Sequence, residues 1–198
     1  MQTYFLCLSS WTIITNVSIK MIQHKHLTYV AMVHTSTCIY LLYNNHNELA
    51  IINTLAYFTS DFIQMVYTNY YDQQNVIIFS FHHIISMVTL LTTEKENVMY
   101  PLMLKVFLDV ERSNVALNIF YITSKITRCK EILCIANGIE ALVYGYYRVG
   151  LVKHCIIELM NNNSITDIAL FGAMYSFGVF FTGVLLCTTY NRIYNLFC

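Results

Sequence analysis

The sequence predicts an all-α integral membrane protein, a polytopic bundle of about seven membrane-spanning helices joined by short loops. Of its 198 residues 57% are hydrophobic and only 11% are charged, and the mean hydropathy is +0.52. Soluble globular domains carry about 25% charged residues. Seven apolar stretches approach the roughly 20 residues that a helix needs to cross the hydrocarbon core of a bilayer. The polar segments between them are too short to hold a soluble domain.

The expected helices follow one another with little chain between them. The first is the least apolar, because Ser, Thr and Asn residues dilute it. We place the spans at residues 3–19, 27–43, 49–67, 75–93, 99–123, 131–152 and 166–190. The expected connections are Lys20–His26, Asn44–Glu48, Thr68–Gln74, Glu94–Val98, Ser124–Lys130 and Lys153–Ile165. One transmembrane domain is therefore expected over residues 1–198.

Positive charge in the connections predicts the orientation. With seven spans, one side carries six basic residues, Lys20, Lys25, Lys125, Arg128, Lys130 and Arg192, and the other carries two, Lys95 and Lys153. Because cytoplasmic loops are enriched in Lys and Arg, the first group is expected in the cytosol together with the C-terminus. The segment Asn162-Asn163-Ser164 would then be a luminal glycosylation sequon.

Several classes of partner and cofactor are not expected. The formal net charge is zero, which gives no reason to expect nucleic acid. The seven cysteines form no C-x-x-C pair, and there is one His-His pair where di-iron membrane enzymes have several histidine clusters. We therefore expect no metal and no bound cofactor. Membrane lipids are the expected partners, and a homo-oligomer fits this class of protein.

Polar residues within the expected spans are the most informative feature. A charge in hydrocarbon costs about 2.5 to 3.5 kcal/mol on insertion scales, so such residues face a bundle interior and have partners. Helical spacing aligns one set on the third span: Asn53, Tyr57, Ser60, Asp61, Gln64 and Thr68. On the sixth span, Asn137, Tyr144 and Arg148 line up, with Glu140 adjacent.

The fifth span carries polar residues on two faces. One face holds Glu111, Asn114 and Asn118, which need partners on other helices. The other holds Lys105, Asp109 and Arg112. Lys105 and Asp109 have the i,i+4 spacing of an ion pair, and we expect that pair to be structural.

Two adjacent histidines on the fourth span are the candidate reactive groups. His82 heads a polar stripe with Ser86, Thr89 and Thr93, and His83 points about 100° away. One interpretation is hydrogen bonding between helices. The other is chemistry, because an imidazole can take a proton or accept an acyl group when a carboxylate such as Asp61 or Glu111 orients it.

Several motifs, taken in order, resemble one family of membrane proteins. The segment Phe81-His82-His83-Ile84-Ile85-Ser86 resembles the His-His signature of the TLC-domain family, which includes the ceramide synthases. Matches before and after it are Ala56-Tyr57-Phe58-Thr59-Ser60-Asp61, Glu111-Arg112-Ser113-Asn114 with Leu117-Asn118, Tyr147-Arg148-Val149, and His34 on an early span. The resemblance covers about residues 27–190. It implies a helical bundle around a lipid-accessible cavity that is lined by Tyr57, Asn114, Asn118, Arg148 and His34, with His82, His83, Asp61 and Glu111 as candidate catalytic residues.

One departure from the family pattern bears on function. Ceramide synthases carry a His-Asp step where this chain reads Leu108-Asp109-Val110-Glu111-Arg112-Ser113-Asn114. The chain is thus more similar to the smaller TLC-domain proteins associated with membrane lipid composition. This predicts a role in lipid homeostasis, binding or modifying phospholipid or sphingolipid, in the endoplasmic reticulum, another endomembrane or the plasma membrane.

Two alternatives stay open, and so does the question of whether the protein is an enzyme. The first is a ceramide synthase-like N-acyltransferase, with acyl-CoA as co-substrate and a sphingoid base as acceptor. The second is a small-molecule transporter or receptor-like bundle. The absence of detectable repeats and the scarcity of Gly and Pro disfavour a transporter.

Overall fold

The computed structural model describes residues 1–22, 26–67, 73–92, 100–161 and 165–197, and all regular secondary structure in these residues is helical. This confirms the predicted all-α class. The chain divides into two compact units, Met1–Leu104 and Lys105–Cys198. The expectation of a single domain stays a prediction.

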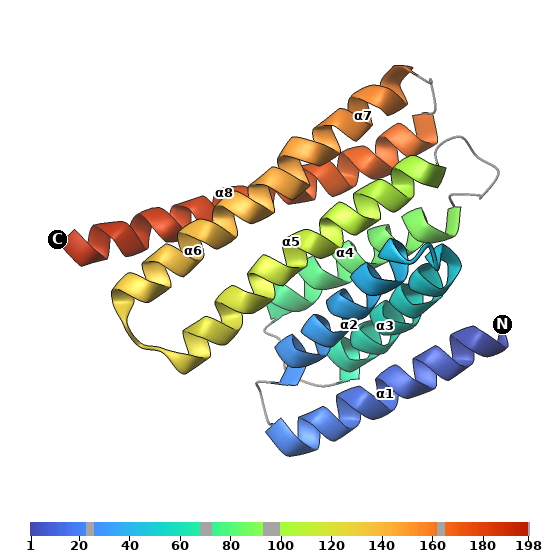
Figure 1. The fold of residues 1–198 in the computed structure, drawn as a ribbon, viewed down its shortest axis with the longest axis horizontal. Helices are drawn as coiled ribbons and strands as arrows, with labels where there is room; N and C mark the ends of the chain where they lie inside the picture. The colour runs from blue at the N-terminus through green and yellow to red at the C-terminus, as the bar shows by residue number, and fades with distance from the viewer. Residues whose placement is uncertain (23–25, 68–72, 93–99, 162–164, 198) are drawn as a thin grey trace. The chain divides into compact units, whose positions relative to one another are not determined.

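The first unit is built around its third helix. It contains α1 (Gln2–Ile22), α2 (His26–Tyr43), α3 (Asn47–Tyr67) and α4 (Gln73–Thr92) (Figure 1). α3 packs against each of the other three. Trp11, Val30, Ala56, Tyr57 and Phe58 form the hydrophobic core. Because α3 is enclosed on several sides, much of the polar stripe predicted along it is buried.

The turn between α2 and α3 shows how a short connection closes without glycine. Asn45 has a φ of 58°, in the left-handed region that Asn tolerates better than most residues. The His46 N–H donates to the Leu41 carbonyl at 2.9 Å, and the Asn45 N–H donates to the Leu42 carbonyl at 3.1 Å. These two bonds are a Schellman motif, which satisfies the last carbonyls of α2 and reverses the chain.

The second unit pairs one long, interrupted helical run with one long helix. It holds the part of α5 (Tyr100–Ile126) from Lys105 onward, followed by α6 (Lys130–Gly145), a π-helical turn η2 (Tyr146–Leu151) and α7 (Val152–Asn161). The run α6–η2–α7 packs along α8 (Ile165–Phe197). Gly138 lies opposite Thr189 and Gly145 opposite Thr182, so the two helices are antiparallel and in constant register.

Most expected helices match observed ones closely, and the principal error concerns a loop. The segment Lys153–Ile165 was expected as a connection, but Val152–Asn161 is helix α7. It contains neither Gly nor Pro, and it buries Val152 and Cys155 while exposing Lys153, which is an ordinary amphipathic pattern. α8 likewise continues to Phe197, past the expected end at residue 190. The sequon at residues 162–164 lies outside the described residues.

Two of the described helices are long and apolar enough to cross a membrane, as judged by length and composition. They are Asn47–Tyr67 in α3 and Ile168–Phe197 in α8. Half of the most apolar window of α3 is buried in the protein, as in the core helix of a soluble protein, whereas only 11% of the α8 window is buried. The arrangement of seven spans therefore stays a prediction.

α6 has an inverted distribution of polarity. Its buried residues include Asn137, Glu140 and Tyr144. Large apolar side chains are exposed along the opposite face: Ile132, Ile135, Ile139 and Leu142, the last with 72% of its surface accessible. A surface helix of a soluble protein has the reverse pattern, with its apolar stripe turned inward.

Candidate functional site

The first unit joins a buried histidine to a carboxylate. His83 of α4 and Asp61 of α3 meet through Nε2 and Oδ2 at 2.7 Å, and their side chains are only 8% and 12% exposed. This is a short, charge-assisted geometry for an imidazole and a carboxylate. Of the two candidate carboxylates, Asp61 is the one that contacts a histidine within this unit.

The contact with Asp61 determines which nitrogen of His83 can react. An ionised carboxylate only accepts hydrogen bonds, so Nε2 carries the proton that it donates to Asp61. In the neutral tautomer Nδ1 then keeps its lone pair. Nδ1 is buried, and no hydrogen-bond partner for it occurs among the described residues. A buried basic nitrogen held in one tautomer is the arrangement that a general base or nucleophile requires.

Aromatic packing fixes the ring of His83. Phe58 stacks on it with ring centroids 4.5 Å apart and planes inclined by 18°. His82 is only partly buried, and its ring centroid lies 5.6 Å from that of His83. Of the two histidines, His83 is the one buried together with Ser86 and Thr89. Both histidines flank Ser86 on a helical wheel, and the position of Asp61 on α3 decides between them.

A second polar cluster surrounds His34 on α2. His34 is 2% exposed and stacks on Tyr57, with centroids 4.0 Å apart. Asn53 Nδ2 lies 3.5 Å from His34 Nδ1, and the indole N–H of Trp11 donates to Asn53 Oδ1 at 3.0 Å. The structure thus brings the predicted residues His34 and Tyr57 together, and Phe58 contacts the rings of both His34 and His83.

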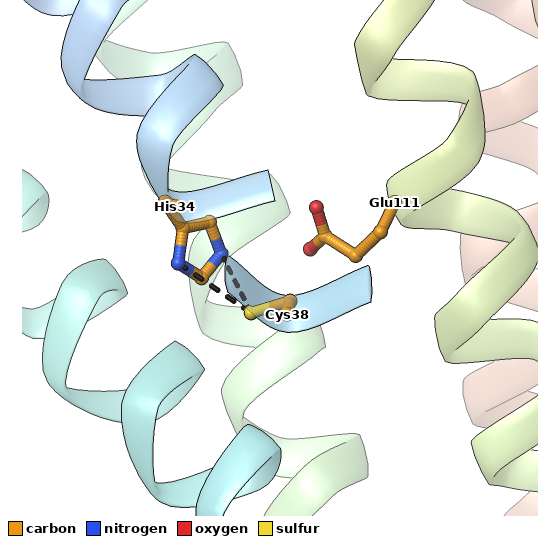
Figure 2. Close-up of side chains that lie close together, drawn as sticks. All are labelled: His34, Cys38 and Glu111. Atoms are coloured by element: carbon orange, nitrogen blue, oxygen red, sulfur yellow. Dashed lines mark hydrogen bonds between the residues drawn. The ribbon is translucent and has the colours of Figure 1, made fainter. Parts of the chain in front are cut away.

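Cys38 completes this cluster one turn along α2 from His34. Its sulfur lies 3.6 Å from Nδ1 and 3.7 Å from Nε2 of that ring (Figure 2). A donor directed at one nitrogen lone pair would be much closer to that nitrogen than to the other. The near-equal distances show that the sulfur packs on the ring, while the 3.0 Å contact with Thr54 Oγ1 is its better hydrogen bond. Cys38 is thus a packed thiol.

In the second unit, a buried arginine organises the polar face of α5. Arg148 Nε donates to Ser113 Oγ at 2.8 Å, and Arg148 Nη2 donates to Asn114 Oδ1 at 2.9 Å. Asn114 Nδ2 in turn donates to Glu111 Oε2 at 3.3 Å. The Tyr144 ring lies 5.2 Å from the guanidinium carbon. Glu111 and Asn118 are 1% and 4% exposed, so both ends of the expected polar face are buried.

The other charged face of α5 has a different ion pair from the one expected. Asp109 Oδ1 accepts a hydrogen bond from Arg112 Nη1 at 2.9 Å. Asp109 is buried, whereas Lys105 is exposed. The predicted Lys105–Asp109 pair was wrong because i,i+3 and i,i+4 partners are both within reach on a helix. Spacing alone could not choose between the two cations.

Three residues of these clusters were missed from the sequence: Trp11, Cys38 and Thr54. Cys38 follows His34 by four residues, a spacing that places both on one helix face and could have been noticed. Trp11 is the single tryptophan of the chain, in the segment that looked least like a span. Thr54 gives no signal, because small hydroxyl residues are common in membrane helices. Thr68 and Thr93 lie outside the described residues.

Trp11 provides a spectroscopic test of the His34 cluster. Asn53→Leu removes the acceptor of the indole N–H, so we expect the emission maximum to move to shorter wavelength and the protein to lose about 1 to 2 kcal/mol of stability. Fluorescence of the purified protein measures both effects. Asn44→Leu, at an exposed position in the turn, should change neither. An unchanged spectrum in Asn53→Leu would show that the indole N–H is not bonded to Asn53.

Among protein-family models, curated proteins and solved structures, none matches the chain.

Proposed function

We propose that the chain is a multi-pass membrane protein of lipid homeostasis that binds or modifies phospholipid or sphingolipid through its His83–Asp61 pair. The observation that carries this proposal is the 2.7 Å contact that leaves His83 Nδ1 buried and without a described partner. A buried polar pair of this kind is costly in an apolar bundle unless a ligand or a reaction uses it. The motifs around it are those that resemble the TLC-domain family.

The distribution of polarity supports a membrane setting. α8 is apolar over a length that can cross a bilayer, and little of its apolar window is buried. α6 turns Ile135 and Leu142 outward and Asn137 and Glu140 inward. In water this would expose apolar surface and bury polar groups, both at a cost. In a bilayer both arrangements are favourable.

The state of His83 favours one class of lipid group. Nδ1 needs a donor, so the ligand should present an O–H or N–H. A phosphodiester has only acceptor oxygens at neutral pH, and its negative charge would lie near Asp61. A hydroxyl or amine on the lipid therefore suits the site better than a phosphate. This also favours the alternative of N-acyl transfer, in which His83 would take a proton from the amine of a sphingoid base.

Lipids retained on purification test the binding function. Protein extracted in mild detergent should carry a hydroxyl- or amine-bearing lipid, and His83→Gln should lose at least about tenfold of it, because one unpaired buried group costs about 1.4 kcal/mol or more. Mass spectrometry measures the amount of lipid that each purified protein retains. His46→Gln, at an exposed turn position, is the matched control. Equal lipid content in wild type and His83→Gln would refute the assignment of lipid binding to this pair.

Labelled acyl-CoA separates binding from catalysis. If the protein transfers acyl groups, membranes supplied with labelled acyl-CoA and a sphingoid base should form amide-linked lipid, and His83→Ala and Asp61→Asn should abolish it. If it only binds lipid, no labelled amide will form although lipid is still retained. Amide formation that survives in both variants would assign the chemistry to other residues.

Thiol labelling tests the proposed orientation. In sealed endoplasmic reticulum vesicles with the cytosolic face outward, a variant that keeps only Cys129 should react with an impermeant maleimide, because Cys129 is exposed in the connection between α5 and α6. A variant that keeps only Cys155 should stay unlabelled. Cys155 lies outside the expected spans, and burial raises the pKa of its thiol, which lowers its thiolate fraction at neutral pH. Rapid labelling of Cys155 before detergent is added would contradict this orientation.

A further inference from the structure

A second polar centre lies where α6 and α8 pack in the second unit, and it uses none of the residues proposed to act on lipid. Gly138 of α6 faces Thr189 of α8, and a Cβ added at Gly138 would lie 3.8 Å from Thr189 Cγ2. Helical side chains lean toward the N-terminus of their own helix. In this antiparallel pair Glu140 therefore leans toward the level of Asn137, and Arg192 leans toward the level of Thr189. Glu140 links the other two polar residues, because it accepts a hydrogen bond from Asn137 and interacts electrostatically with Arg192.

Two atoms at this level lack partners in the part of the chain that the structure describes. Asn137 is completely buried, and its Nδ2 donates to Glu140 Oε2 at 3.0 Å, yet its Oδ1 accepts no hydrogen bond. Arg192 Nε is buried and donates to nothing, while its guanidinium carbon lies 5.6 Å from the centre of the Phe120 ring. Leaving this acceptor and this donor unpaired costs about 1 to 3 kcal/mol for each atom.

The two unpaired atoms are of opposite kind, because Asn137 Oδ1 accepts hydrogen bonds and Arg192 Nε–H donates one. A phosphodiester, which has only acceptor oxygens, could pair with Arg192 but not with Asn137, and an ammonium group, which has only donors, could pair with Asn137 but not with Arg192. A neutral O–H group can donate to Asn137 Oδ1 and accept from Arg192 Nε at the same time. We propose that this centre binds a neutral O–H group, either the hydroxyl of a lipid alcohol or an ordered water.

Two probes and one conservative variant test this site. The purified protein is incubated in detergent with dioleoylglycerol, which has one free hydroxyl, or with its methyl ether, and adducts are counted by native mass spectrometry. Arg192→Lys keeps the positive charge opposite Glu140 but removes the Nε–H donor. Arg128→Lys, at an exposed position, makes the same chemical change elsewhere. Asn137→Leu, which removes the acceptor, is a second variant in case Arg192→Lys does not fold.

Binding of a lipid alcohol predicts a preference of about tenfold for dioleoylglycerol over its ether in wild type and Arg128→Lys, and none in Arg192→Lys or Asn137→Leu. If the preference is absent, a high-resolution map that shows ordered water within hydrogen-bond distance of Asn137 Oδ1 and Arg192 Nε assigns the O–H group to water. Absence of both the preference and the water would overturn the proposal. An equal preference in wild type and Arg192→Lys would also overturn it.

Discussion

Arg148→Met should lower the free energy of unfolding by about 3 kcal/mol, one of the largest stability effects expected for a single substitution in this chain. The change leaves Ser113 Oγ and Asn114 Oδ1 without the donor that each has in the wild type, and it removes the cation from the Tyr144 ring. Unsatisfied buried polar groups cost about 1 to 3 kcal/mol each. Thermal unfolding in a single detergent measures the loss.

Arg128→Met is the matched control for this prediction, because Arg128 is exposed in the connection before α6. It should change the unfolding temperature by no more than about 4 °C, since exposed charges contribute about 0 to 1 kcal/mol. If Arg148→Met were as stable as Arg128→Met, the Arg148 network would not be formed in the folded protein.

Gly178→Ala should destabilise the protein by about 1 to 3 kcal/mol, whereas Gly172→Ala on the same helix should be neutral or stabilising. A Cβ at Gly178 would lie 3.0 Å from Arg148 Cβ and 3.1 Å from the Arg148 carbonyl oxygen, and a backbone atom cannot move aside cheaply. At Gly172 nothing lies within 4 Å. There the added methyl gains up to about 1 kcal/mol of helix propensity.

The pair of glycine variants differs only in position, so detergent and helix propensity affect both alike. The unfolding temperatures of the two purified variants measure this difference in stability. A decrease confined to Gly178→Ala supports close packing of α8 against η2. Equal unfolding temperatures would mean that α8 does not approach Arg148 in the way described.

The helices of this fold were predictable, because an apolar stretch of about 20 residues leaves few alternatives to a helix. The connections were harder to predict. Polarity suggested a loop at Lys153, but hydrogen-bonded helix tolerates exposed polar residues, and no Gly or Pro ends it before Asn161. The π-helical turn at Tyr146–Leu151 has no sequence signature, although it carries Arg148.

The composition of the polar clusters in each unit was partly predictable, and the pairing within them was not. Residues that are expensive to bury stand out in an apolar sequence, so Asp61, His83, Glu111 and Arg148 could be named. Which atom meets which depends on the rotation of each helix against its neighbours. Lys105 and Arg112 both lie within reach of Asp109 on the same helix, and His82 and His83 are adjacent on α4. Only the packing of the helices decides which residue of each pair forms the contact.

Lipid profiles of cells are the most direct test of the central claim that the His83–Asp61 pair acts on membrane lipid. Wild type, His83→Ala and His46→Ala are expressed at matched membrane levels, and ceramides and phospholipid acyl chains are quantified by mass spectrometry. The account predicts a shift in lipid composition with wild type and His46→Ala, and none with His83→Ala. A shift of equal size in all three, or in none, would contradict it.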